Sequence, residues 1–142
     1  MNRLNKLVLI SSAVVGSTFF GSAAMAQAAP NGVLNGVVVA TKGITVTCDL
    51  KLTLDAANNK GSIEMNPGDT NCAALHFNNM PYTTTYSAGV LTFKNVDVTT
   101  ITIGDCYGDI SGTWDGSTLT ISGAVLPPHT GGPACTVDGF AA

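Results

Sequence analysis

An unbroken alternation of apolar and polar residues runs from Ile44 to Asp55. Because successive side chains of a β-strand point to opposite faces, this period of two predicts a long strand with one face on a core and the other in water. Turn residues follow at positions 58–61, and Ser62 to Met65 resume the alternation before Asn66 and Pro67 end it. This part of the chain therefore predicts a β-hairpin.

A second hairpin is predicted closer to the C-terminus. Ile110 to Trp114 and Ser117 to Ser122 flank the dipeptide Asp115-Gly116, which suits a tight primed turn with two positive φ angles. A loop rich in Pro and Gly then precedes a short terminal strand from Ala134 to Phe140.

Val90 to Ile103 is rich in Val, Ile and Thr and also predicts a strand. Its apolar residues change phase part of the way along, and a β-bulge near Lys94 and Asn95 would bring the two halves into register. No apolar stripe of useful length with a helical spacing follows the first 26 residues. The chain is therefore predicted to be all-β, a compact antiparallel β-sandwich or flattened barrel of about seven to nine strands.

The first 26 residues have the features of an export signal. A short cationic stretch precedes an apolar run from Leu7 to Phe20, and Ala24-Met25-Ala26 has the small-x-small pattern that signal peptidases accept. The run is shorter than the roughly 20 residues that a membrane span needs. We expect cleavage before Gln27, which leaves residues 27–142 as one exported domain without a membrane span, in the periplasm or outside the cell.

All four cysteines follow this signal: Cys48, Cys72, Cys106 and Cys135. An even number of cysteines in an exported chain predicts two disulfides, for which three pairings are possible. The similar separations within each half of the chain favour Cys48 with Cys72 and Cys106 with Cys135. Zinc sites use close ligand pairs such as C-x-x-C, which this sequence does not contain.

Charged residues are sparse, at 11% of the chain. After the signal, nine acids face four lysines, which gives a formal charge of −5 (four minus nine), and the lysines are scattered singly: Lys42, Lys51, Lys60 and Lys94. A nucleic-acid surface needs clustered cations that displace counterions. Nucleic acid is therefore excluded as a partner.

The candidate catalytic residues lack the context that catalysis needs. His76 and His129 lie in no motif for a nucleophile, a metal site or a phosphate loop, and each is interpreted as a structural histidine. Four acids near the third cysteine fit a solvated rim better than a calcium loop or a glycosidase pair: Asp97, Asp105, Asp109 and Asp115. We therefore predict no catalytic residues, no metal and no cofactor.

Large amphipathic side chains form the remaining candidate site: Phe77, Pro81, Tyr82, Tyr86 and Trp114. Because Tyr and Trp are favourable where wet and apolar phases meet, these residues are candidates for contact with a hydrocarbon, a lipid surface or a partner. Filling of the core is the simpler interpretation. The uncharged segment Val33 to Ala40 is either a first or edge strand, or a strand donated to a neighbour during self-association.

Several short motifs follow one another along the chain: Cys48-Asp49-Leu50, Cys72, Asn79-Met80-Pro81-Tyr82, Cys106, Ser111-Gly112-Thr113-Trp114 and Cys135-Thr136-Val137. Their order resembles the exported protein activator of alkane oxidation family (PraB type), over essentially the whole mature chain. Tyr82, where relatives can carry Trp, is a departure that keeps an aromatic ring.

The resemblance implies an accessory role outside the cytoplasm, in which the protein promotes bacterial use of alkanes by contacting or dispersing the hydrocarbon. It implies no catalytic residues. Apolar side chains on a disulfide-locked body would cover hydrocarbon, at roughly 25 cal/mol per Å², while the acids stay in water. A structural subunit of a fibre or biofilm matrix that assembles by strand donation is the alternative, and a small hydrolase is a third hypothesis.

Overall fold

The computed structural model describes residues 27–66, 72, 75–99 and 104–142, so the expected signal at residues 1–26 lies outside the described residues. The described residues form nine strands: β2 (Gly32–Lys42), β3 (Ile44–Asp55), β4 (Lys60–Asn66), β5 (His76–Asn78), β6 (Tyr82–Ser87), β7 (Val90–Thr99), β8 (Asp105–Trp114), β9 (Leu119–Leu126) and β10 (Cys135–Ala141). Among these residues no helix has the length and hydropathy of a membrane span. The prediction of an all-β protein is confirmed.

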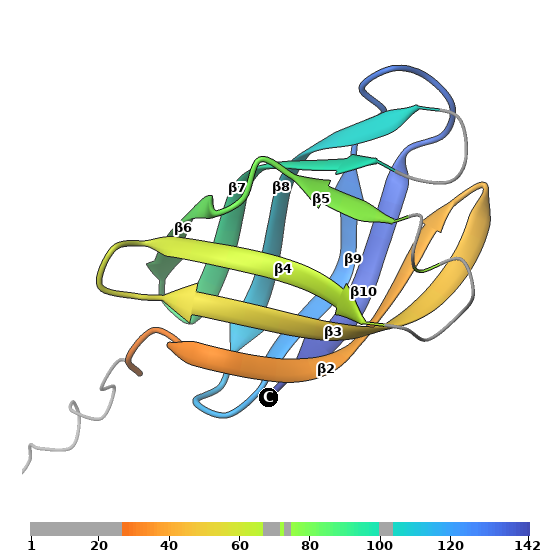
Figure 1. Ribbon diagram of the computed structural model, residues 1–142. Helices are drawn as coiled ribbons and strands as arrows, with labels where there is room; N and C mark the ends of the chain where they lie inside the picture. Colours follow the sequence, from red (N-terminus) through yellow and green to blue (C-terminus); the bar gives the residue numbers. More distant parts are fainter. Residues whose placement is uncertain (1–26, 67–71, 73–74, 100–103) are drawn as a thin grey trace, which may run out of the picture.

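Eight of the strands form a closed antiparallel barrel (Figure 1). Around the wall the order is β2, β3, β4, β6, β7, β8, β9 and β10, and β10 pairs with β2 again. The short β5 pairs with β7 beyond the part of β7 that pairs with β6. The sequence predicts a β-sandwich or a flattened barrel, and the structure is a barrel.

The alternation of apolar and polar residues in the sequence places the apolar side chains inside this barrel and the polar side chains outside it. Along β3 every second residue from Val46 to Leu54 is buried, and the polar residues between them are exposed or half-buried. Phe93, Ile110 and Leu126 fill the interior from other strands and are almost completely buried. Burying one such side chain contributes about 1.5–3 kcal/mol, so this interior is the main source of stability.

Two disulfides join the predicted pairs of cysteines. Cys48 on β3 is bonded to Cys72, with 5.8 Å between the Cα atoms, and Cys106 on β8 is bonded to Cys135 on β10, with 6.1 Å between the Cα atoms. The pairing favoured by the sequence is confirmed. Structural disulfides are typical of oxidising compartments outside the cytosol, which agrees with export.

The predicted bulge in β7 is confirmed. The register of β7 against β8 shifts between Phe93 and Val96, and Asn95 has a positive φ of 57°. Asp109 on β8 holds this bulge, because its carboxylate accepts hydrogen bonds from Lys94 Nζ at 2.8 Å and from the Asn95 backbone N–H at 2.9 Å. The bond from Lys94, followed by the bond from Asn95, lowers the pKa of Asp109.

The predicted two-residue primed turn at Asp115-Gly116 is wrong. Gly116 has a positive φ, but Asp115 does not, and the connection between β8 and β9 spans residues 115–118. The Asp115 carboxylate accepts the backbone N–H groups of Ser117 and Thr118 at 2.9 and 2.8 Å, and these bonds lower its pKa. A side chain that bonds to the backbone two residues onward stabilises this longer turn in place of the tight one.

Val33 to Ala40, expected to be a first or an edge strand, belongs to the first of the described strands and does not lie at an edge. This segment lies in β2, which pairs with β3 along its whole length and with β10 from Gly36 to Thr41. The backbones approach so closely that a Cβ atom on Gly36 would lie 1.8 Å from the carbonyl oxygen of Phe140. Only glycine fits there, and closure of the barrel leaves no free edge on this part of β2.

Candidate functional site

One end of the barrel contains an apolar pocket, which we call the barrel-end pocket. It is a small cavity of about 30 Å³, or about 530 Å³ when the space open to solvent is included. The cavity is much smaller than the roughly 150 Å³ cavity that holds a benzene ring, so it has room for the end of an alkyl chain and not for a whole one. The described lining residues are Val38, Ala40, Thr41, Lys42, Ile44, Val46, Met65, Leu75, Phe77, Val98, Leu126, Cys135 and Val137.

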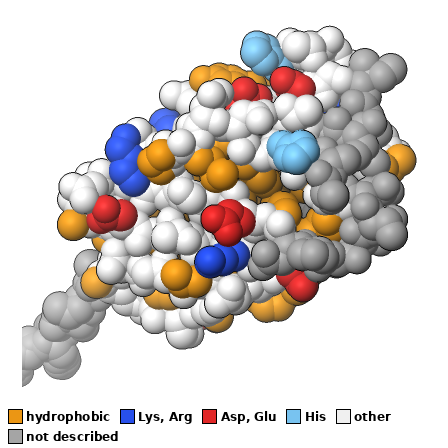
Figure 2. All heavy atoms as spheres, in the orientation of Figure 1, with side chains coloured by type: hydrophobic (Ala, Val, Ile, Leu, Met, Phe, Trp, Pro, Cys, Tyr) orange, Lys and Arg blue, Asp and Glu red, His pale blue; other side chains and the backbone are white. Residues whose placement is uncertain are grey.

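The backbone pairing of the barrel wall is interrupted beside this pocket. β4 pairs with β6 only through its first two residues, Lys60 and Gly61, and no described residue of β4 pairs with β5. The backbone N–H of Ile63 on β4 donates instead to the sulfur of Met80, 3.1 Å away. Figure 2 shows hydrophobic side chains at the surface in the region between β4 and β5. We call this gap, between residues 62–65 of β4 and β5, the β4–β5 opening.

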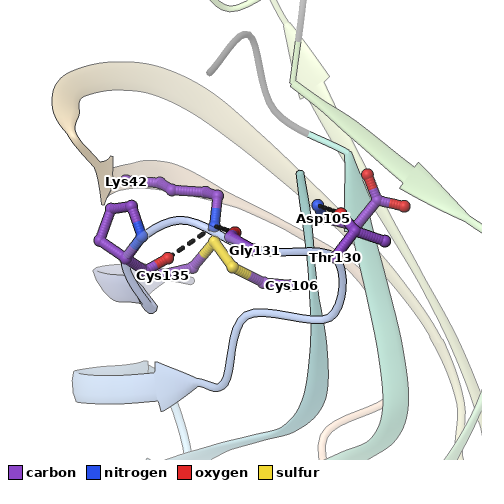
Figure 3. The surroundings of a disulfide bond; sticks show 7 residues. Lys42, Asp105, Cys106, Thr130, Gly131 and Cys135 are labelled. Carbon is purple, nitrogen blue, oxygen red and sulfur yellow. Dashed lines mark hydrogen bonds between the residues drawn. A yellow bond between two sulfur atoms is a disulfide. The ribbon is translucent and has the colours of Figure 1, made fainter. Parts of the chain in front are cut away.

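Lys42 is the one charged side chain among the described residues that line the pocket. It continues the interior row of β2 after Val38 and Ala40, so the alternation of the strand turns it inward. Its side chain is buried, with 4% of the residue exposed, and Nζ donates to the carbonyl oxygens of Gly131 at 3.0 Å and Pro133 at 2.6 Å (Figure 3). The ion pairs among the described residues involve other lysines, so the described partners of Lys42 are neutral.

The loop of residues 127–134, which accepts both of these hydrogen bonds, is also attached to β8. The disulfide between Cys106 and Cys135 joins β8 to the residue that follows the loop. The backbone N–H of Asp105 donates to Thr130 Oγ1 at 2.8 Å (Figure 3). The carbonyl oxygen of Asp105 accepts the backbone N–H of His129 at 2.6 Å. These bonds hold the loop at the pocket end, although the pocket beside it is not filled by side chains.

The residues predicted for apolar contact do not form one surface. Phe77 lines the barrel-end pocket, and Pro81 is exposed on the link between β5 and β6, after a cis peptide bond. Tyr82 is only 3% exposed, its hydroxyl donates to the carbonyl oxygen of Asn78 at 2.5 Å, and burial raises its pKa to about 12. Tyr82 therefore belongs to the core, and its predicted contact with an external phase is wrong because the side chain faces the barrel interior.

Tyr86 and Trp114 lie at the opposite end of the barrel from Phe77. Tyr86 pairs with Leu91 on β7, whereas Phe77 pairs with Val98, seven positions further along the same strand and therefore roughly 20 Å away. The backbone N–H of Trp114 donates to the carbonyl of Gly89, beside Tyr86. Both rings are half-buried and pack against the core, where they close that end of the barrel.

The histidines and acids considered for catalysis have structural surroundings. His76 is exposed on β5, and His129 is exposed with its ring 5.5 Å from the ring of Tyr107. Asp109 and Asp115 stabilise the bulge and the turn described above. In the described part of the chain, no group of three or more side chains of the kinds that bind metals comes together.

Two features of the surface and the pocket were missed by the sequence analysis. Lys42 has the same parity as the interior residues Val38 and Ala40, so the alternation already indicated an inward-facing lysine. Phe140 is 51% exposed on the outside of β10 and pairs directly with Val37 of β2, which makes an exterior apolar pair. This pair depends on the register between the two ends of the chain, which no local pattern indicates.

The chain was compared with known proteins in three ways. A family model described as alkane oxidation protein activator PraA/PraB-like matches residues 1–142. Neither the curated proteins nor the solved structures contain a match.

Proposed function

The chain belongs to the family of PraA/PraB-like alkane oxidation protein activators, and on this basis we propose that it is an exported, non-catalytic accessory protein that contacts alkyl chains through the barrel-end pocket. The observation that carries the proposal is the pocket itself, which is lined almost entirely by apolar side chains and adjoins a gap in the wall of an otherwise closed barrel. Two disulfides suit a protein that works outside the cytosol.

The dimensions of the pocket indicate how such contact would work. Each methylene group that leaves water contributes about 0.8 kcal/mol. Because the cavity has room for only the end of a chain, the rest of the chain would lie along the β4–β5 opening, next to Met65 and Phe77. Binding of this kind is weak and exchanges quickly, which suits a protein that helps to disperse or transfer hydrocarbon, while the excess of acids keeps the protein in water.

Two exposed residues at opposite ends of the barrel provide a matched test. Ile44 lines the mouth of the pocket and Val90 begins β7 at the other end, and both are 39% exposed. We expect n-decane to shift the amide resonances of the pocket residues in the mature chain. Ile44→Ser should weaken this binding about fivefold, since part of the apolar wall is lost, and Val90→Ser should leave it unchanged. Absence of shifts at the pocket, or equal effects of the two variants, would contradict the proposal.

The alternative function is a structural subunit of a fibre or biofilm matrix. Donation of β2 would require breaking its ladder with β10, so self-association through the outer faces, where Val37 and Phe140 form an apolar pair, is the more accessible route. Electron microscopy and sedimentation of the mature chain, with Phe140→Ser for comparison, test this alternative. Monomers alone at high concentration would count against it.

A further inference from the structure

We infer that the barrel-end pocket selects alkyl chains that carry a carboxylate, with Lys42 as the residue that binds the head group. This inference rests on the proposed function, because it specifies the ligand of the same pocket. It goes beyond contact with a hydrocarbon, since an alkane has no charge for Lys42 to recognise.

The first observation is the unusual environment of Lys42. Lysine is almost never fully buried unless it is paired, because a cation loses its hydration on burial. The Lys42 ammonium group has two carbonyl oxygens as described partners, and no carboxylate among the described residues lies within ion-pair distance. Figure 3 shows that Asp105, on β8, points its carboxylate away from Lys42. Within the part of the chain that the structure describes, the site therefore has a buried positive charge and no anion.

The second observation is the apolar wall beside this charge. Ile44, Val46 and Leu126 line the same pocket as Lys42. A ligand that satisfies both features has an apolar tail for the wall and one negative charge for the ammonium group, with which it forms a charge-assisted hydrogen bond.

The chemistry of the head group follows from the presence of a single lysine. Sites for doubly charged phosphate groups commonly use the planar fork of arginine or several cations, whereas one ammonium group matches one carboxylate. Alkyl carboxylates are the chemical class that terminal oxidation of an alkane produces. The reaction that supplies the ligand would therefore be an oxidation of the chain end.

The test compares three ligands that share a ten-carbon tail: decanoate, 1-decanol and decyltrimethylammonium, each below its micelle concentration at neutral pH. We expect decanoate to bind the mature chain at least tenfold more tightly than 1-decanol, and the cationic ligand to bind most weakly. Lys42→Met keeps an unbranched apolar side chain of nearly the same length and removes the charge, so the affinity for decanoate should fall to within about twofold of that for 1-decanol. Lys42→Arg should retain the preference.

Lys60→Met is the matched control, because Lys60 is exposed at the opposite end of the barrel and its loss changes the net charge equally. It should leave the preference for decanoate unchanged. A second readout uses the unmodified protein: the Nζ resonance of Lys42 should shift with decanoate and not with 1-decanol, whether or not Lys42→Met folds.

The outcomes separate this inference from the proposed function. The role of Lys42 would be overturned by equal binding of decanoate and 1-decanol, by a preference that survives Lys42→Met, or by an unchanged Nζ resonance. In each of these cases, binding of n-decane would still support the pocket. If neither n-decane nor any of the three ligands binds, both the proposed function and this inference fail.

Discussion

The two ends of the barrel are built from the same alternating strands but are closed in different ways. At the end opposite the pocket, which we call the closed end, the strands are joined by the short connections 56–59, 88–89 and 115–118, and Tyr86 and Trp114 cover the core. At the pocket end Gly43 alone joins β2 to β3, whereas the longer connections 67–75, 100–104 and 127–134 join the other strands, and each disulfide includes a cysteine within or next to one of these longer connections.

The difference indicates how a small barrel can keep a pocket and remain stable. Short turns are closed at little entropic cost, and the side chains above them can fill the interior. Longer connections lose more entropy on folding, and the disulfides offset this loss by restricting the unfolded chain. The pocket end is therefore held by covalent bonds and by hydrogen bonds to loop carbonyls, and filling by side chains is less complete there.

Removing the disulfide between Cys106 and Cys135 is expected to have the largest effect. Replacing both cysteines by Ser should lower the free energy of unfolding by about 3–4 kcal/mol, because the loop between them regains its freedom in the unfolded chain. Urea denaturation measures this loss. Hydrogen exchange should show that protection falls more at the start of β10 than at Trp114, and an equal fall at both ends would contradict the comparison.

Removing the Tyr82 hydroxyl, which lies at the boundary of the β4–β5 opening, should have an intermediate effect on stability. Tyr82 belongs to the last residue pair between β4 and β6, and its hydroxyl donates to the carbonyl of Asn78 on β5. Tyr82→Phe should cost about 1–2 kcal/mol, since it leaves the part-buried carbonyl of Asn78 without this donor. Tyr86→Phe, at the closed end, is the control, because no hydrogen bond of the Tyr86 hydroxyl is found within the described residues.

The pH dependence of this contribution follows from the direction of the pKa shift. Burial raises the pKa of Tyr82 from 10.0 to about 12, so folding disfavours the phenolate. The stabilisation is complete below about pH 10, where the unfolded tyrosine is neutral, and is lost as the pH rises through about 12. Ultraviolet titration should detect this late ionisation, and its persistence in Tyr82→Phe would show that another tyrosine is responsible.

Filling the pocket should have the smallest effect on stability. Ala40 and Ala124 are both half-buried against the core, but only Ala40 lines the pocket. Ala40→Val should stabilise the fold by about 0.5–1 kcal/mol and weaken binding of n-decane. Ala124→Val should leave that binding unchanged. If Ala40→Val left the affinity for n-decane intact, the barrel-end pocket would not be where the chain binds.

Much of the fold could be predicted because its causes are local. The alternation from Ile44 to Asp55 identifies a strand, and the change of phase after Phe93 identifies the bulge at Asn95. The disulfide pairing also agreed with the spacing of the cysteines. The turn at Asp115 was mispredicted, since side-chain bonds to the following backbone compete with the φ preference of the dipeptide.

The candidate site was predicted much less well. Phe77, Tyr82, Tyr86 and Trp114 share a residue type, but the structure places them at both ends of the barrel and in the core. Parity along β6 puts Tyr82 and Tyr86 on the interior face, so this error could have been avoided. The position of Lys42 beside Gly131 and Pro133 could not have been predicted, because the two segments lie far apart in the sequence, near the start and the end of the barrel.

The sequence alone determined which side chains face inward, where the strands turn and which cysteines are available for pairing, because strand alternation and turn chemistry act over a few residues. Only the tertiary structure decided that the sheet closes on itself, that β4 separates from β5 and that a lysine lies buried beside an apolar pocket. Those features depend on the shear and register of strands distant in the chain, which are set by packing of the whole interior.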